Sequence, residues 1–111
     1  MRKPADPREL AVALLRRSTC MVQVAAVLAD SYGISSWGWN NSGADGLGEH
    51  AEAHCMRRAN RRRSAVSTIY VAAKRRRNGK AVTAKPCPEC ARILKNVGKI
   101  SYRDSKGVWH G

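Results

Sequence analysis

The pattern of apolar and polar positions predicts short helices and strands in mixed order. Asp6, Pro7 and Glu9 precede a run of alanine, valine and leucine, which is typical of a capped amphipathic helix. Stretches rich in valine or aromatic residues, bounded by turn residues, indicate strands. In chain order we expect a helix at 7–17, strands at 21–29 and 34–40, a helix at 50–63, a strand at 67–72, a helix at 87–97, and strands at 100–103 and 107–110.

The connections between these elements limit how the strands can pair. Residues 30–33 form a turn between the first two strands, which predicts an antiparallel hairpin. Residues 104–106 are too few for anything but an antiparallel last pair. Residues 40–48 contain three glycines and show no periodicity, so they are expected to form a loop. The order of elements predicts one α/β domain over residues 1–111, with a five-stranded mixed sheet and helices packed on it.

Charge adds a second feature, because 21 Lys and Arg stand against 8 Asp and Glu, giving +13 at pH 7 in 111 residues. A domain with this charge repels itself, and a polyanion relieves the repulsion. Nucleic acid is therefore the first candidate partner, ahead of an anionic membrane. The sequence has no apolar run of about 18 residues and no signal-peptide pattern, so we expect a soluble, cytoplasmic protein. The oligomeric state does not follow from the sequence.

The basic residues gather in two places. Five of them surround Asn78-Gly79, a tight-turn dipeptide, and should stand on a protruding hairpin tip. Others lie in the second half of the helix expected at 50–63, where cations also complement the helix dipole, so that a structural role stays open. The residues expected to contact phosphates are Lys74, Arg75, Arg76, Arg77 and Lys80 at the tip, and Arg57, Arg61 and Arg62 on the helix.

Two short motifs carry metal-binding chemistry: His-Ala-Glu at residues 50–52 and Pro-Cys-Pro-Glu-Cys at residues 86–90. One imidazole and two thiolates can hold a tetrahedral zinc and leave its fourth position open to water. A hydrolytic centre also needs a carboxylate that carries protons without binding the metal. We therefore expect Zn²⁺ to be bound by His50, Cys87 and Cys90, with Glu52 as the catalytic residue.

The remaining candidate ligands are better explained by packing. Cys20 and Cys55 lie among apolar residues, where a reduced cysteine acts as a small buried hydrophobe. His54 lies two residues after Glu52, so the sequence places the glutamate one position too late for the His-Glu-x-x-His motif of zinc proteases. We therefore expect His54 to pack or to lie on the helix surface, and not to bind the metal.

His-x-Glu followed by Pro-Cys-x-x-Cys is the signature of the zinc-dependent cytidine deaminase superfamily, which the chain resembles over nearly its whole length. The resemblance implies a cytidine-deaminase-like three-layer fold and the zinc and Glu52 roles given above. Trp39-Asn40 before the loop is similar to bacterial tRNA adenosine deaminases, and the remainder is similar to small phage and toxin-associated deaminases. This likeness implies that Asn40 contacts the target sugar and that the amide of Ala51 holds a base carbonyl. For Trp39, substrate binding by base stacking and core packing both stay open.

The chain differs from the tRNA enzymes in its longer spacer, in residues 83–85 and in the tight turn between its last strands. In the resembled superfamily such a turn accompanies nucleoside deaminases and DNA-deaminating toxins. Our leading hypothesis is the zinc-dependent hydrolytic deamination of cytosine to uracil in DNA, with single-stranded DNA as partner. The alternatives are a deaminase of free deoxycytidine or dCMP, an RNA adenosine deaminase, and a non-catalytic zinc-stabilised nucleic-acid-binding module, which has no use for Glu52.

Overall fold

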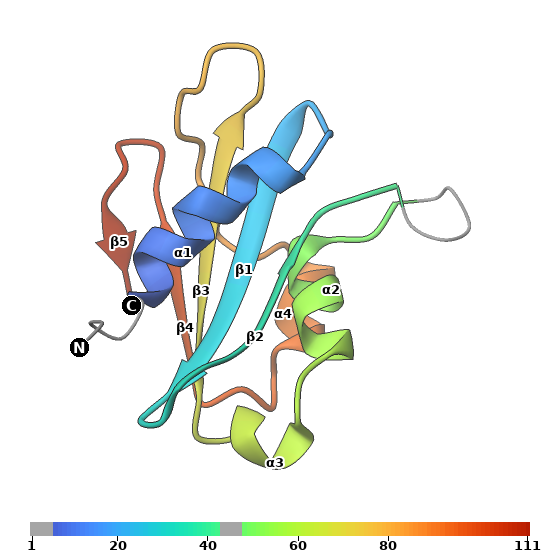
Figure 1. The fold of residues 1–111 in the computed structure, drawn as a ribbon, viewed down its shortest axis with the longest axis vertical. Coiled ribbons are helices and arrows are strands. Elements are labelled where there is room, and N and C mark those ends of the chain that lie inside the picture. The colour runs from blue at the N-terminus through green and yellow to red at the C-terminus, as the bar shows by residue number, and fades with distance from the viewer. Residues whose placement is uncertain (1–5, 43–47) are drawn as a thin grey trace, which may run out of the picture.

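The computed structural model describes residues 6–42 and 48–111, apart from the side chain of Arg61; residues 43–47 of the predicted loop lie outside this part. Helices and strands follow one another in the predicted order (Figure 1). They are α1 (Pro7–Leu14), the short 3₁₀ helix η1 (Leu15–Arg17), β1 (Val22–Asp30), β2 (Gly33–Trp39), α2 (Ala51–Arg57), α3 (Arg61–Ser64), β3 (Thr68–Arg75), α4 (Pro88–Ile93), β4 (Lys99–Arg103) and β5 (Trp109–His110). None of the helices within the described residues is long and apolar enough to cross a bilayer.

The five strands form one mixed sheet in the order β2-β1-β3-β4-β5. The β1–β2, β1–β3 and β4–β5 pairs are antiparallel, whereas β3 and β4 run parallel. The parallel pair needs a crossover, which α4 supplies. The predicted five-stranded mixed sheet with an antiparallel last pair is thus confirmed.

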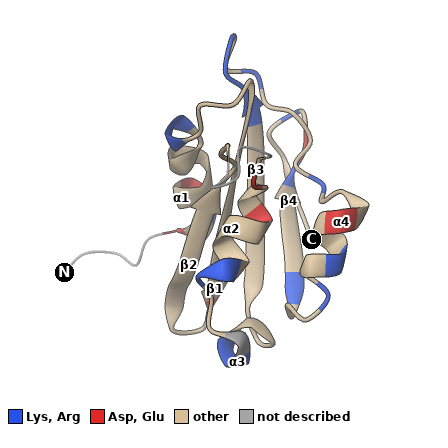
Figure 2. Ribbon diagram, turned by 90° about the vertical axis from the view of Figure 1, so that its right-hand side faces the viewer, with Lys and Arg blue, Asp and Glu red and all other residues tan. Residues whose placement is uncertain are grey.

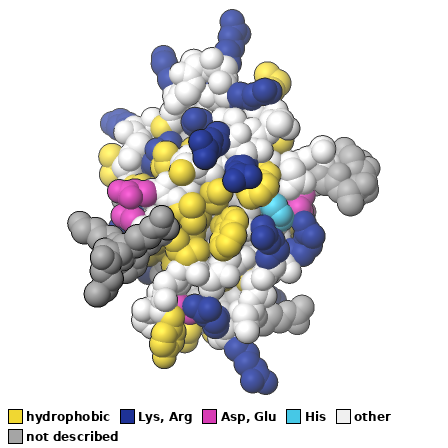
Figure 3. All heavy atoms as spheres, viewed as in Figure 1, with side chains coloured by type: hydrophobic (Ala, Val, Ile, Leu, Met, Phe, Trp, Pro, Cys, Tyr) yellow, Lys and Arg dark blue, Asp and Glu magenta, His cyan; other side chains and the backbone are white. Residues whose placement is uncertain are grey.

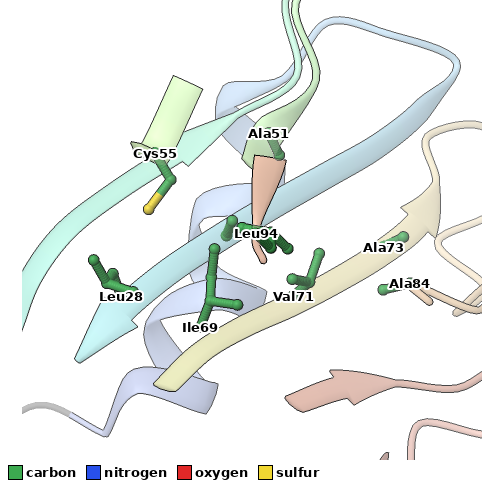
Figure 4. Close-up of a cluster of buried hydrophobic side chains, with 9 residues drawn as sticks. Leu28, Ala51, Cys55, Ile69, Val71, Ala73, Ala84 and Leu94 are labelled. Atoms are coloured by element: carbon green, nitrogen blue, oxygen red, sulfur yellow. The ribbon is translucent and has the colours of Figure 1, made fainter. Parts of the chain in front are cut away.

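Helices cover both faces of the sheet, because successive strand residues point to opposite sides and both sides of β1 are apolar. On one face, α2 and α4 cover a cluster that includes Ala26, Leu28, Ile69, Val71 and Leu94 (Figure 4). On the other face, α1 covers a cluster that includes Ala11, Leu15, Ala25, Val27 and Ala72. The architecture therefore has three layers, as expected.

The helix predicted at 50–63 is in fact two helices, α2 and α3. Asn60 has an extended backbone (φ −80°, ψ 120°), and its side chain accepts a hydrogen bond from the backbone N of Arg62 at 2.9 Å. Asparagine is a strong helix N-cap, and this local hydrogen bond competes with continuation of α2. The sequence prediction was wrong here because apolar periodicity was given more weight than this capping signal.

Gly38 in β2 sets the distance between the sheet and α2. A Cβ atom at this position would lie 2.5 Å from the backbone N of Cys55 and 2.9 Å from the carbonyl carbon of His54. Only glycine allows this approach, so α2 packs closely on β2. The described ends of the preceding loop are joined by backbone hydrogen bonds between Asn41 and Glu49 of 2.8 and 3.0 Å. These contacts fix where α2 begins.

Candidate active site

The three predicted zinc ligands lie where two helices begin. His50 immediately precedes α2 and Cys87 immediately precedes α4, although the two residues are 37 positions apart in the sequence. The Sγ atom of Cys87 accepts a hydrogen bond from the backbone N of Cys90 at 3.5 Å, and Pro88 occupies the first helical position. Proline suits that position, since it has no N–H that needs a partner and its φ is already helical. Cys90 therefore lies within the first turn of α4, beside Cys87.

The geometry of these side chains fits a single zinc ion. The Nδ1 atom of His50 lies 3.0 Å from the Sγ atom of Cys90 and 3.9 Å from that of Cys87, and all three atoms lie within 4.8 Å of one another. A tetrahedral zinc with bonds of about 2.0 Å to nitrogen and about 2.3 Å to sulfur separates its donors by roughly 3.5–3.8 Å. Only small side-chain movements are needed to reach that arrangement. One nitrogen and two sulfurs are also a donor set typical of zinc.

The surroundings of Cys90 disfavour its thiolate form unless a cation is present. Burial raises the pKa of the Cys90 thiol above its usual range, and the neighbouring Glu52 carboxylate and Cys87 thiol raise it further. A positive ion among these groups favours the thiolate and offsets the mutual repulsion. The chemistry of the donor set and the charge of its surroundings therefore agree on a bound metal.

Glu52 lies in the first turn of α2, two residues after His50, and only 5% of its surface is exposed. It faces the same pocket as the ligands, but the group of described residues able to hold an ion consists of His50, Cys87 and Cys90 alone. A carboxylate near the metal donors and outside the donor set matches the predicted placement of a proton carrier.

A pocket of about 210 Å³ opens in front of the ligands and Glu52. Its walls are formed by the start of β1, the end of β3 and the segment that precedes Cys87, with the lining residues Val22, Val24, Asn40, Ala51, Ala73, Thr83, Ala84 and Lys85. Pockets for drug-sized ligands measure about 300–1,000 Å³, so this one suits a single planar base. A sugar and phosphate attached to the base must lie at or beyond the mouth.

Asn40 and Ala51 both line the pocket, as predicted for substrate-binding residues. Most of the hydrogen-bonding capacity of the Asn40 amide is already taken up within the protein. Its Oδ1 accepts hydrogen bonds from Ser18 Oγ (2.6 Å) and Val24 N (2.9 Å), and its Nδ2 donates one to Val22 O (2.8 Å). One Nδ2 hydrogen is left for a ligand. The sugar contact of Asn40 and the base contact of the Ala51 amide stay predictions.

Trp39 takes the packing role that the sequence left open. Its ring packs against the cluster under α1 and meets the ring of His54 edge to face, with centroids 5.0 Å apart. It is absent from the lining of the pocket formed by the described residues. These contacts favour the packing role, and substrate binding by Trp39 stays a prediction. The side chain of a strand residue next to Asn40 points to the opposite face of the sheet, which explains the difference between Trp39 and Asn40.

The other histidine and cysteine of α2 serve packing. The Nδ1 atom of His54 accepts a hydrogen bond from the backbone N of Trp39 at 3.1 Å, which ties α2 to β2. Cys55 is fully buried, and burial raises the pKa of its thiol to about 11. Such a thiol stays protonated and inert near neutral pH. Neither residue belongs to the group of described residues that can hold an ion.

The cations predicted at the hairpin tip lie at the pocket end of the sheet. We refer to residues 74–80 as the basic tip. Its turn is closed by hydrogen bonds from Gly79 N to Arg75 O (2.8 Å) and from Arg75 N to Lys80 O (2.9 Å), and Gly79 has a positive φ of 70°. Beyond the tip, Val82 N donates to the carbonyl of Ala73, a pocket residue, at 3.1 Å. The basic tip is thus continuous with a wall of the pocket.

The cations predicted on the second helix lie elsewhere. Arg57 forms a bidentate ion pair with Glu49, with N···O distances of 3.0 and 3.1 Å. Arg62 is exposed in α3, before the start of β3, whereas the pocket lies at the end of β3. Arg61 begins α3, but its side chain lies outside the described atoms. The structure therefore does not bring these arginines together with the basic tip.

Several pocket residues were missed in the sequence. Val22 and Val24 were expected only as strand residues, and Thr83 and Lys85 only as part of a connection. The position of Lys85 two residues before a metal ligand is a signal that could have identified it, because a metal site fixes the backbone next to each ligand. The role of the two valines depends on strand pairing and has no local signal.

Comparison with known proteins agrees with this geometry. Residues 4–102 match the family model described as the cytidine and deoxycytidylate deaminase zinc-binding region. The match, the fold and the His50, Cys87 and Cys90 group together define a zinc-dependent hydrolase of the deaminase class. The chain belongs to the cytidine and deoxycytidylate deaminase family. The predicted family and the predicted zinc cofactor are thereby confirmed.

The fold is shared with solved structures of bacterial cytidine deaminases. A cytidine deaminase from Burkholderia pseudomallei superposes with a TM-score of 0.70 at 19% identity, over 94% of this chain and 87% of that chain. A single-site mutant of the cytidine deaminase from Mycobacterium tuberculosis superposes with a TM-score of 0.56 at 18% identity, over 85% and 79% of the two chains. A comparison with curated protein sequences yields no match. The predicted cytidine-deaminase-like fold is confirmed.

Proposed function

We propose that this deaminase converts cytosine to uracil in single-stranded DNA. One observation carries the proposal: a pocket large enough for one base opens beside the basic tip, whose cations form none of the ion pairs between described residues. A base inserted into the pocket leaves its sugar-phosphate outside, next to these cations. Figure 3 shows dark blue side chains gathered at the upper end of the molecule, where the basic tip projects.

In the proposed reaction, Glu52 moves the protons. A zinc ion held by His50, Cys87 and Cys90 would lower the pKa of a water molecule, which would then serve as the nucleophile. Glu52 accepts a proton from this water and donates it to N3 of cytosine as the water oxygen bonds to C4. It then transfers the second water proton to the C4 amino group. The C4–N bond breaks, ammonia leaves, and C4 keeps a carbonyl, which gives uracil.

The other pocket residues orient the base. Val22, Val24, Ala73 and Ala84 supply apolar surface against which the faces of a planar ring can pack. The backbone N–H of Ala51, which lines the same pocket, is a candidate donor to the C2 carbonyl of cytosine. Because the pocket is narrow, C4 then points inward to Glu52 and the sugar points outward.

The substrate strand must expose its base. In a duplex, C4 of cytosine lies within the stack, so an enzyme has to act on single strands or flip the base out. Flipping costs several kcal/mol, and single strands avoid most of this cost. A basic groove that follows the backbone is the usual means of holding a single strand without regard to sequence.

A second candidate is the deamination of free deoxycytidine or its monophosphate. It is favoured by the fold, since the two solved structures described above are named cytidine deaminases, and by the tight turn between β4 and β5. In that case the basic tip serves purposes other than substrate binding. RNA adenosine deamination is a third possibility. A comparison of substrates distinguishes the three.

The test is a substrate comparison with zinc-loaded protein. Cytosine-containing single-stranded DNA, the same sequence as duplex, the matching RNA and free dCMP are incubated separately, and the nucleosides are then quantified by mass spectrometry. We expect uracil to form fastest from single-stranded DNA. Faster turnover of dCMP than of the oligonucleotide supports the second candidate, and inosine from RNA supports the third.

Metal removal provides an independent check. Dialysis against a chelator should abolish turnover, and addition of one equivalent of zinc should restore it, because the nucleophile depends on the metal. Loss of oligonucleotide binding together with turnover indicates that zinc also stabilises the fold, whereas zinc-dependent binding by a protein that shows no turnover at all indicates a non-catalytic binding module. Loss of turnover with binding retained indicates a catalytic metal.

A further inference from the structure

Lys85 is the only Lys or Arg among the described residues that line the catalytic pocket. The other lining residues are apolar or neutral except Glu52 and the two thiol ligands, of which Glu52 and Cys90 are buried and Cys87 is exposed. An anionic group on a substrate is repelled by the Glu52 carboxylate and attracted by the Lys85 ammonium group. The position of this lysine is therefore a candidate determinant of which cytosine-bearing molecules enter.

The backbone around Lys85 is held in place on both sides. Ala84 is 6% exposed, packs in the core under α2 and α4, and donates from its N to Arg103 O at 2.9 Å. Ala84 is buried in the core whereas Lys85 is exposed, so the Lys85 side chain points away from the core. Two residues later comes Cys87, whose position the metal site fixes. The ammonium group thus extends from an anchored backbone beside the pocket.

Among the described residues, no acid forms an ion pair with this ammonium group. Two acids outside the pocket have other partners: Glu49 pairs with Arg57, and Asp104 pairs with His110 at 2.6 Å. Lys85 is also joined to the basic tip by a short segment, because residues 81–85 lead directly from Lys80 to the pocket mouth. The cations of the basic tip and Lys85 thus follow one another along the chain.

We propose that Lys85 binds the phosphate attached to the target nucleoside and so selects phosphate-bearing cytosine over the free nucleoside. The proposal rests on the proposed function and adds a specificity-determining residue to it. The cations of the basic tip then bind phosphates farther along the strand. The same chemistry serves a free nucleotide or a strand, so the experiment has to separate these two sources of phosphate.

The test compares Lys85→Gln with Lys99→Gln, which removes another exposed cation at the start of β4, the end of the sheet remote from the pocket. For each variant, kcat/KM is measured with deoxycytidine, dCMP and a single-cytosine oligonucleotide. We expect Lys85→Gln to lower the ratio of kcat/KM for dCMP to that for deoxycytidine about five- to tenfold, through KM. With the oligonucleotide, the slope of log KM against log salt concentration should fall by about 0.7, the value for one phosphate contact on a single strand.

Lys85→Arg keeps the charge and should restore both readouts, while Lys99→Gln should change neither. Equal effects of Lys85→Gln and Lys99→Gln overturn the proposal. An equal loss of kcat/KM for deoxycytidine and dCMP in Lys85→Gln also overturns it, because such a loss indicates a disturbed site. A change with dCMP but not with the oligonucleotide assigns the phosphate to free nucleotides. If the wild type deaminates none of these substrates, the proposed function fails, whereas oligonucleotide binding measured by fluorescence anisotropy still compares the two variants.

Discussion

Basic residues lie toward both ends of the sheet, in very different surroundings (Figure 2). We refer to the arginines of residues 57–63 as the α3 end. There, Arg63 forms a bidentate ion pair with Asp30 at 2.7 and 2.9 Å, Arg57 pairs with Glu49, and Arg58 lies over the ring of Trp37. At the basic tip no ion pair of this kind occurs between described residues. Carboxylate partners, more than the number of cations, distinguish the two ends.

This difference shows how the overall charge should be interpreted. A charge of +13 indicates a polyanionic partner but says nothing about where the partner binds. At the α3 end, ion pairs and the ring contact occupy several cations and join α3 to the β1–β2 turn. Strand β3 separates the two ends by eight residues, which span about 25 Å at roughly 3.3 Å per residue. The basic tip, in contrast, is continuous with a wall of the pocket and forms no ion pair between described residues, so the proposed function assigns phosphate binding to it.

The largest expected effect comes from Glu52→Gln, which separates binding at the basic tip from chemistry in the pocket. Glutamine fills the same space but cannot carry a proton, so kcat should fall by about 10³–10⁴-fold. Oligonucleotide affinity, measured by fluorescence anisotropy, should stay within about twofold of the wild type, because Glu52 lies outside the basic tip. Turnover that persists at the wild-type rate contradicts the role of Glu52. A matching loss of affinity contradicts the division between binding and chemistry.

The next effect tests the two ends directly with two triple variants of equal charge. The tip variant replaces Arg75, Arg77 and Lys80 by glutamine, and the control variant replaces Arg62, Lys95 and Lys99. If each tip cation contacts one phosphate, affinity for a single-stranded oligonucleotide at about 0.15 M salt should fall roughly ten- to a hundredfold in the tip variant. The control variant should lose less than about threefold, because it changes only the long-range field.

Salt titrations sharpen this comparison. The slope of log affinity against log salt concentration should fall by about two in the tip variant, since each contact with a single strand contributes about 0.7. Equal slopes and equal losses in the two triple variants would show that total charge, and not the position of the basic tip, governs binding.

Most of the fold could be predicted from the sequence because its signals are local. The Asp6 cap and Pro7 predict where α1 begins, and Asn78-Gly79 predicts the turn of the basic tip. The zinc ligands could be predicted equally well, since one imidazole and two thiols at these spacings have few other uses. In each case the residue type itself restricts the backbone or the chemistry.

The parts that sequence reasoning missed depend on contacts between distant segments. The pairing of Arg57 with Glu49 and of Arg63 with Asp30 was not foreseen, because it requires the packing of α2 and α3 beside β2. The Asn40 amide was expected to face a ligand, yet it also bonds to the backbone of β1. Lys85 lines the pocket together with Ala73 of β3, and this proximity of two distant segments has no local signal in the sequence. Such partners cannot be derived from periodicity or composition.

A smaller effect separates stability from binding. Arg63→Gln leaves the Asp30 carboxylate, whose side chain is 3% exposed, without its cationic partner, and should lower the thermal unfolding midpoint by several degrees. Arg77→Gln removes an exposed cation that forms no ion pair with the described residues, and it should leave the midpoint unchanged. Differential scanning calorimetry of both variants at pH 7 checks this expectation. A drop for Arg77→Gln as large as that for Arg63→Gln would contradict the assignment of structural ion pairs to the α3 end.

The smallest effect is the pH dependence of that difference. The Arg63 guanidinium lowers the pKa of Asp30 below its usual value of 3.8, and Arg57 lowers the pKa of Glu49 below 4.5. A carboxyl whose pKa is depressed by folding stabilises the protein above its unfolded pKa and loses this contribution as the pH falls. The midpoint difference between wild type and Arg63→Gln should therefore be constant from pH 7 to about pH 5 and should shrink below about pH 4. The Asp104–His110 pair lowers the pKa of Asp104 to about 2, but it is present in both proteins and cancels. A difference that persists undiminished at pH 3 would assign the role of Arg63 to packing instead of charge.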